Sequence, residues 1–145
     1  MTITLDTDSL RYIAALEKVS GARVVDCICE EDKITYVIQN GQLGAAIGKA
    51  GANVKKLTTA LGKKIHLVEL DGDPLKFTAN LIGGEIRVNE MNLKEIPAPE
   101  QPIKKIIIET NTRNRGTIVG KGGKNIEMIK NLLKRHHGID DVIVR

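Results

Sequence analysis

Two short stretches rich in glycine and lysine hold the residues of this chain that are best suited to chemistry. The first is Ile47–Gly51 (IGKAG), and the second, 72 residues later, is Val119–Gly123 (VGKGG). In each stretch a lysine follows the first glycine, and a helix-like pattern of apolar residues comes after the last glycine. Glycines let a ligand approach the main chain closely, and a helix N-terminus presents unpaired N–H groups and the positive end of its dipole. The pattern therefore predicts a site that binds phosphate groups.

The two stretches belong to a longer internal repeat. At the same offset Gly44 is matched with Gly116, and the apolar residue Leu57 with Ile129. A self-match in one register indicates a duplication, and therefore two units of similar structure. A single Gly-x-x-Gly could be no more than a tight link between two helices. Two copies with lysine at the same place favour phosphate binding.

Basic residues are concentrated around both stretches. The whole chain of 145 residues has a net charge of +4. Residues 41–66 contain five lysines and no acidic residue, and residues 111–137 contain seven basic residues and one acidic residue. A solvated helix face could explain either cluster alone. Because both clusters coincide with the glycine stretches, we expect a surface that binds nucleic acid.

The repeated pattern Ile/Val-Gly-Lys-x-Gly-x-Asn-Val/Ile resembles the signature of the KH domain. Two tandem copies in a short chain resemble the archaeal NusA-like transcription factors, and the resemblance covers nearly all of the sequence. In KH domains the glycine turn holds the backbone of about four nucleotides of single-stranded RNA while the bases lie on an apolar groove. The residues expected to bind RNA are Ile47, Gly48, Lys49, Ala50, Gly51 and Lys55 in the first copy, and Arg113, Arg115, Val119, Gly120, Lys121, Gly122, Gly123 and Lys124 in the second.

Apolar periodicity and turn residues predict the elements of the first copy. A helix over 6–20 is expected to be capped at Asp8 or Ser9 and to end at Gly21. The elements expected after it are strands over 22–30 and 33–38, a short helix over 42–47, a longer helix over 53–61 and a strand over 64–68. This order resembles the type II form of the KH fold.

The second copy is expected to repeat this order, with a boundary at Asp71–Pro74. The elements expected are a helix over 75–82, strands over 85–93 and 104–110 joined by a proline-rich connector over 97–102, a helix over 111–119 capped at Asn111 or Thr112, a long helix over 124–137 and a strand over 141–144. The predicted fold class is α/β (α+β), with a KH domain over 1–72 and another over 73–145. Each domain is expected to have a three-stranded sheet packed by helices.

Residue types and spacing do not support an enzyme. The stretch around Gly120 lacks the glycine spacing and the Ser or Thr of a phosphate-binding P-loop, and no catalytic triad or pair of carboxylates stands out. Cys27 and Cys29 are expected to be reduced thiols on one strand face, and the adjacent His136 and His137 to be helix-end cations. We expect no catalytic residue, no metal and no cofactor.

By resemblance, the chain is expected to bind single-stranded RNA and to act on nascent transcripts during elongation or termination. RNA polymerase is a candidate partner, and a ribosomal or RNA-processing adaptor is the alternative function. A helix-turn-helix DNA binder is the other alternative, because it too has a glycine-containing turn before a basic helix. Ile47 and Val119, with Val54 and Ile126 behind them, are candidates for an apolar groove or for core packing. The sequence shows no signal peptide or membrane span, and predicts a cytoplasmic monomer.

Overall fold

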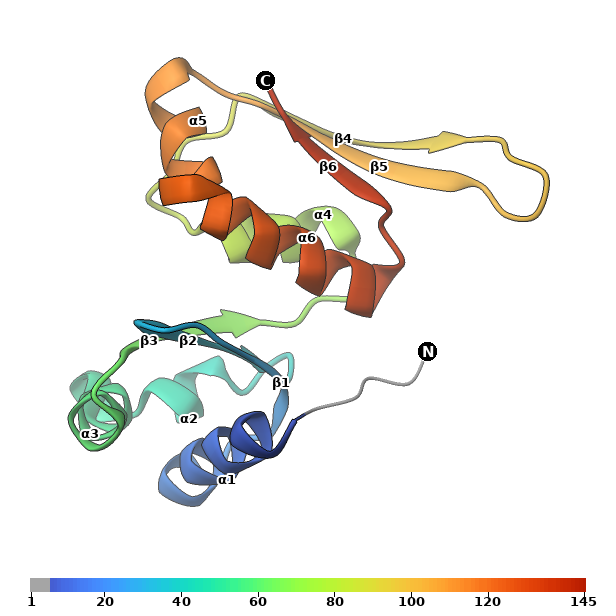
Figure 1. Ribbon diagram of the computed structural model, residues 1–145. Helices are drawn as coiled ribbons and strands as arrows, with labels where there is room; N and C mark the ends of the chain where they lie inside the picture. The colour runs from blue at the N-terminus through green and yellow to red at the C-terminus, as the bar shows by residue number, and fades with distance from the viewer. Residues whose placement is uncertain (1–5) are drawn as a thin grey trace. The chain divides into compact units, whose positions relative to one another are not determined.

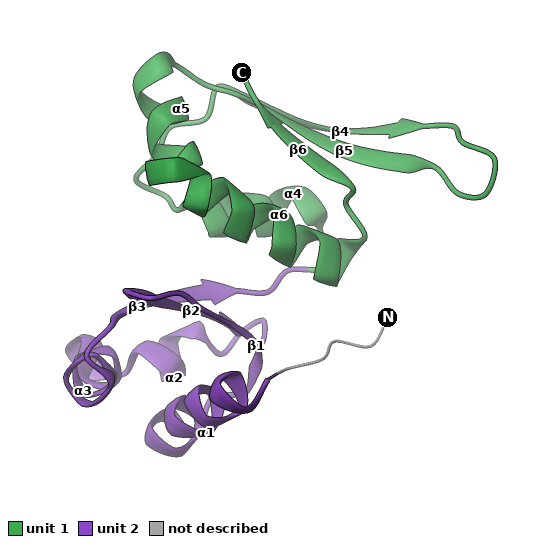
Figure 2. Ribbon diagram, viewed as in Figure 1, with its two compact units in different colours: residues 1, 72–145 green, residues 2–71 purple. Residues whose placement is uncertain are grey.

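The computed structural model describes residues 6–145. Figure 1 shows its helices and strands. The chain divides between Asp71 and Gly72 into two compact units, which are coloured separately in Figure 2. Each unit contains one three-stranded sheet.

The first unit follows the order helix, strand, strand, helix, turn, helix, strand. Its elements are α1 (Thr7–Ser20), β1 (Val24–Cys29), β2 (Lys33–Ile38), α2 (Leu43–Ile47), the single 3-10 turn η1 (Lys49–Gly51), α3 (Ala52–Leu61) and β3 (Lys64–Glu69). The central strand β2 pairs antiparallel with β1 and parallel with β3. The helices lie on one face of this sheet (Figure 1).

The core of the first unit lies between the sheet and its helices. Ile34, Tyr36 and Ile38 alternate along β2 and are fully buried against apolar residues of α1 and α3, including Leu16 and Leu57. The hydroxyl of Tyr36 donates a 2.8 Å hydrogen bond to the main-chain oxygen of Tyr12 in α1, which satisfies its one polar atom. This bond fixes α1 over the central strand.

Cys27 and Cys29 lie on β1 and are both free thiols. Their sulfur atoms are 3.8 Å apart, and the Cys29 sulfur lies 3.6 Å from the hydroxyl oxygen of Ser9 on α1. Burial raises the pKa of the Cys27 thiol well above its ordinary value. Cys27 therefore stays protonated and serves as a packing residue.

The second unit repeats the order and the sheet pattern of the first. Its elements are α4 (Pro74–Ile82), β4 (Glu90–Ile96), β5 (Ile103–Glu109), α5 (Thr112–Val119), η2 (Lys121–Gly123), α6 (Lys124–His137) and β6 (Asp141–Val144). The central strand β5 pairs antiparallel with β4 and parallel with β6. Ile106 and Ile108 on β5 and the apolar face of α6 are fully buried.

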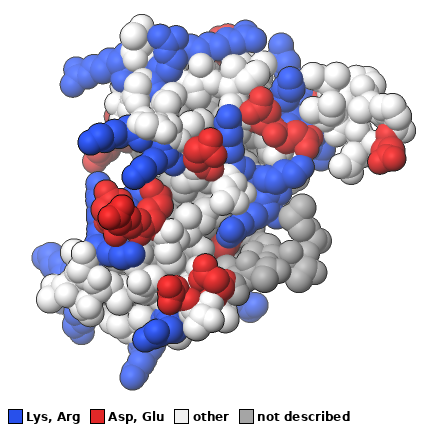
Figure 3. All heavy atoms as spheres, in the orientation of Figure 1, with Lys and Arg blue, Asp and Glu red and all other residues white. Residues whose placement is uncertain are grey.

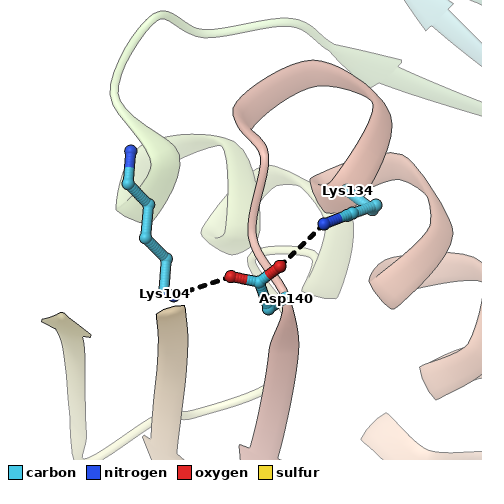
Figure 4. Close-up of polar contacts among 3 residues, drawn as sticks. All are labelled: Lys104, Lys134 and Asp140. Carbon is cyan, nitrogen blue, oxygen red and sulfur yellow. Dashed lines mark hydrogen bonds and ion pairs between the residues drawn. The ribbon is translucent and has the colours of Figure 1, made fainter. Parts of the chain in front are cut away.

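Two features distinguish the second unit. Strands β4 and β5 form a long hairpin that extends past the helices (Figure 1). Just before β6, Asp140 joins α6 to the start of β5 (Figure 4): one carboxylate oxygen lies 2.7 Å from the Lys134 ammonium, and the other accepts a 2.8 Å hydrogen bond from the main-chain N–H of Lys104. These bonds lower the pKa of the Asp140 carboxyl, and the Lys134 bond has the largest effect.

The predicted mixed fold of two helix-packed three-stranded sheets is confirmed, but two predicted details are wrong. Helix α1 is capped by Asp6, which accepts a 2.7 Å hydrogen bond from the Ser9 main-chain N–H, and not by Asp8 or Ser9. The first strand of the second unit covers 90–96 instead of 85–93. The start of β4 is set by its pairing with β5. The first paired residues are Glu90 and Glu109, and the Asn89 main-chain N–H donates a hydrogen bond to the Glu109 oxygen at this end of the strand pair.

Within residues 6–145, no helix is long and apolar enough to cross a membrane. The same residues contain no group of three or more His, Cys, Asp or Glu side chains that could hold a metal ion.

Candidate nucleic-acid interface

The first glycine turn, residues 48–51, lies between α2 and α3. Gly48 has φ 79° and ψ 169°, and Gly51 has φ 74°. Ala50 between them also has a positive φ of 54°, the one such value outside glycine among the described residues. A main-chain hydrogen bond of 3.1 Å from Gly51 N–H to Gly48 oxygen closes the turn. The chain thus reverses within four residues and starts α3 directly.

The second glycine turn, residues 120–123, lies between α5 and α6 and has the same backbone conformation. Gly120 has φ 77° and ψ 172°, Gly122 has φ 64° and Gly123 has φ 75°. Its closing hydrogen bond, from Gly123 N–H to Gly120 oxygen, is also 3.1 Å long. Gly122 takes the place that Ala50 occupies in the first turn, so the two turns differ in residue type but not in shape.

An asparagine braces each turn from the inside. Asn53 donates a 3.1 Å hydrogen bond from its side chain to the Ala45 oxygen, and Asn125 donates a 2.9 Å hydrogen bond to the Ile118 oxygen. Each bond holds the helix before the turn to the first residues of the helix after it. The repeat at equal spacing was visible in the sequence, but its bracing role was not.

The outer side of each turn is open. A Cβ atom added at Gly51 or Gly123 would meet no atom within 4 Å. The helices that follow also lack a side-chain cap, whereas α1, α4 and α5 are capped by Asp6, Asp73 and Asn111. Asn111 is one of the two predicted caps for its helix, and this prediction is confirmed. Ala52 and Lys124, the first residues of α3 and α6, donate their main-chain N–H groups to the oxygens of Lys49 and Lys121. No side chain occupies these helix starts, so the positive end of each helix dipole faces an anion outside the turn.

The cationic side chains predicted for the site are all exposed. Lys49 lies in the first turn and Lys55 on the first part of α3, while Lys121 and Lys124 lie at the corresponding end of the second unit. Arg113 and Arg115 lie on α5, which leads into the second turn. Figure 3 shows basic side chains over the part of the second unit that contains α5. Each unit thus has its predicted cations beside an uncapped helix start.

The four candidates for an apolar groove are half-buried. Ile47 and Val119 are the last residues of α2 and α5, and Val54 and Ile126 lie in the first turn of α3 and α6. Each pair therefore combines core packing with a partly open surface beside its glycine turn. On the neighbouring strand β3, burial lowers the pKa of His66 to about 4, so this side chain is neutral near pH 7 and adds no charge.

Comparisons with known proteins agree with this geometry. A family model described as KH domain matches residues 10–71. Curated proteins described as probable transcription termination protein NusA are similar over nearly the full length. The one from Methanococcus vannielii is 33% identical and covers 99% of this chain and 80% of that protein. The one from Halobacterium salinarum is 33% identical and covers 98% of both chains.

A solved structure is similar to the whole chain as well. The structure, described as the crystal structure of APE1850, aligns with a TM-score of 0.74 at 29% sequence identity. The alignment covers 97% of this chain and 100% of that one. The order of elements in both units is therefore an arrangement that occurs in a known protein.

Proposed function

Because the chain belongs to the NusA-like family of KH-domain proteins, we propose that it binds single-stranded RNA through both glycine turns and acts in the cytoplasm on nascent transcripts, as a factor for transcription termination or elongation. Its relatives carry the name transcription termination protein. The family model covers only the first unit. The second unit enters the proposal because it repeats the element order, the strand pairing and the turn.

The observation that carries the proposal is the shared shape of the two turns. Ala50 in the first turn and Gly122 in the second are equivalent residues, and both have a positive φ. Alanine adopts this conformation at a cost of roughly 1 kcal/mol. In both units, main-chain hydrogen bonds close the turn, and the helix that follows starts without a side-chain cap. A phosphodiester outside the turn would face the positive end of the helix dipole, and the lysine would supply the opposite charge.

Half-buried aliphatic residues beside each turn would account for a preference for a single strand. Ile47 and Val54 in the first unit, and Val119 and Ile126 in the second, offer aliphatic contact to unstacked bases. The chain has only two tyrosines and one phenylalanine, and Tyr36 and Phe77 are fully buried. Base stacking on an aromatic platform is therefore not the mode of binding that we propose.

The test is to replace Lys49 and Ala50, and Lys121 and Gly122, with aspartate. The four substitutions place negative charge where phosphate would bind, and aspartate tolerates the left-handed conformation of Ala50 and Gly122 better than most residues. We expect RNA binding in a gel shift to be lost while the circular dichroism spectrum stays unchanged. A matched control, Arg11→Asp with Lys76→Asp and Lys94→Asp, lowers the net charge equally at exposed positions away from the turns.

Two outcomes would contradict the proposal. Normal RNA binding by the folded turn variant would exclude the glycine turns as the site. Stronger competition by duplex DNA than by unstructured RNA of equal length would favour the helix-turn-helix alternative, because a KH groove admits one strand.

The partner that we propose is RNA polymerase. Capture of the native protein would test whether RNA polymerase or ribosomal subunits bind to it.

A further inference from the structure

An exposed arginine lies shortly before the first strand in both units. Arg23 is the residue before β1, and Arg87 lies three residues before the start of β4. The two are 64 residues apart, so the repeat at 72 residues does not match them in the sequence. Their equivalence is a property of the fold.

The equivalence rests on the main chain. The Arg23 oxygen accepts a 3.0 Å hydrogen bond from the Gln39 N–H, just after the central strand β2. The Arg87 oxygen accepts a 2.6 Å hydrogen bond from the Thr110 hydroxyl, just after the central strand β5. Each arginine is thus fixed to the segment that leads from the central strand into the short helix.

A second hydrogen bond ties each arginine to the start of that helix. The Arg23 N–H donates a 2.6 Å hydrogen bond to the side-chain oxygen of Gln42, the residue before α2. The Arg87 oxygen accepts a 3.1 Å hydrogen bond from the side chain of Asn114, in the first turn of α5. The short helix therefore has an arginine fixed at its beginning and a glycine turn at its end.

The spacing suits a chain of phosphates. Helix α2 has five residues and α5 has eight, which corresponds to lengths of about 8 and 12 Å at a rise of ~1.5 Å per residue. Residues 39–68 and 110–126 contain no acidic residue. In the first unit the Glu69 carboxylate nevertheless lies beside the start of this path, where it accepts a 3.1 Å hydrogen bond from the Gly41 N–H. In the second unit, Arg113 and Arg115 lie on α5 between the two ends.

The two guanidinium groups are free to bind. Both side chains are exposed, and within residues 6–145 neither has an ion pair or a side-chain hydrogen bond. Asp26, the acidic residue nearest along the chain to Arg23, is buried, and the Glu17 carboxylate accepts a 3.2 Å hydrogen bond from the Val24 N–H. Because every hydrogen bond that fixes Arg23 and Arg87 uses the main chain, the side chains are not needed for the fold.

We propose that Arg23 and Arg87 each bind a phosphate of the RNA strand held by the neighbouring glycine turn, so that each unit grips the strand at both ends of its short helix. This inference rests on the proposed function and adds two residues to its site. A guanidinium forms two parallel hydrogen bonds to a phosphate, which suits an anchor on an exposed loop.

The experiment measures the affinity of the full chain for a single-stranded RNA of about twelve nucleotides at several salt concentrations. We expect Arg23→Gln and Arg87→Gln each to reduce the log–log salt slope by about 0.7, and the double variant by about 1.4. Arg23→Lys and Arg87→Lys keep the charge and should keep the slope. Arg11→Gln and Lys76→Gln remove one exposed charge from each unit elsewhere and should leave it unchanged.

The outcomes separate this inference from the proposed function. If the aspartate variants of the turns lose RNA binding while Arg23→Gln and Arg87→Gln keep the wild-type slope, the arginine contacts are refuted and the function stands. An equal loss of slope in the Arg11 and Lys76 controls would also refute them, because it would reflect net charge alone. If the wild type binds no RNA, both proposals fail together.

Discussion

Gly48 and Gly120 are the residues at which conformation and packing both require glycine. Their φ and ψ values near 79° and 170° fall in a region that is essentially restricted to glycine. A Cβ atom would also come within 2.7 Å of the Asn53 side-chain nitrogen in the first unit, and within 2.7 Å of the Asn125 Cβ in the second. These are the asparagines that brace the turns, so the clash would disturb the brace as well.

Replacing Gly48 or Gly120 with alanine should therefore destabilise its unit by about 2–4 kcal/mol, the sum of backbone strain and the displaced asparagine. Gly51→Ala and Gly123→Ala are the matched controls. They have a positive φ but open space around them, so we expect a loss of about 1 kcal/mol. Urea unfolding of the four variants tests the difference. Equal losses at all four positions would show that the asparagine contact contributes nothing.

At the scale of elements, the sequence predicts best where burial dictates the residue pattern. Strand β2 is buried from Ile34 to Ile38, where Thr35 is the one polar residue, and its predicted bounds are those observed. The prediction for β4 was wrong because Ile86 and Val88 alternate with polar residues as a strand would. That segment instead forms the loop whose main chain fixes Arg87 to Thr110 and Asn114. Propensity alone does not specify such long-range hydrogen bonds.

In the candidate site, too, the locally determined features were predicted from the sequence and the features that depend on tertiary contacts were not. The glycines, lysines and asparagines of the turns repeat at one offset, and a local backbone shape needs only local sequence. Arg23 and Arg87 were not predicted, because Gly48 follows Arg23 by 25 positions whereas Gly120 follows Arg87 by 33. The β4–β5 hairpin is longer than the β1–β2 hairpin, and this difference moves the two arginines out of register. Their shared place is created by pairing with the central strand, which is a tertiary feature.

Asp140 allows a test of how α6 is joined to the sheet. The pKa of Asp140 is lower in the folded protein than in the unfolded chain, so the ionised carboxylate stabilises the fold at a pH above the ordinary carboxyl pKa. This stabilisation is lost as the pH falls through the lowered pKa of the folded state. Asp140→Asn removes the ion pair with Lys134 at every pH. We therefore expect the variant to melt below the wild type between pH 5 and 7, and the gap to close as the pH falls below about 4.

Glu100→Gln serves as the control for this measurement. Glu100 is exposed in the hairpin loop and has no ion pair among the described residues, so its variant should melt like the wild type at each pH. A gap for Asp140→Asn that stays constant into the acid range would mean that the ion pair is not its cause.

At the scale of the whole molecule, the short link between the units limits how far apart their two turns can move. Strand β3 ends at Glu69 and α4 begins at Pro74. The four residues between them span at most ~14 Å when fully extended. A strand of RNA held by one turn would therefore keep its free part at high effective concentration near the other turn.

We expect affinity to rise steeply with RNA length from about four nucleotides, which fill one groove, to roughly eight to twelve, and then to level off. Insertion of a flexible Gly-Ser segment of about ten residues between Gly72 and Asp73 should weaken the binding of twelve-nucleotide RNA, because it lowers the effective concentration of the second turn. The same insertion should leave the binding of four-nucleotide RNA unchanged, which controls for damage to either unit.

The aspartate variant of a single turn should abolish the length dependence and so reproduce single-site binding. Titration of each protein with RNAs of increasing length measures all three effects. Equal affinity of the wild type for four and twelve nucleotides would instead show that only one turn binds RNA, and the second unit would then have lost its contact with the strand.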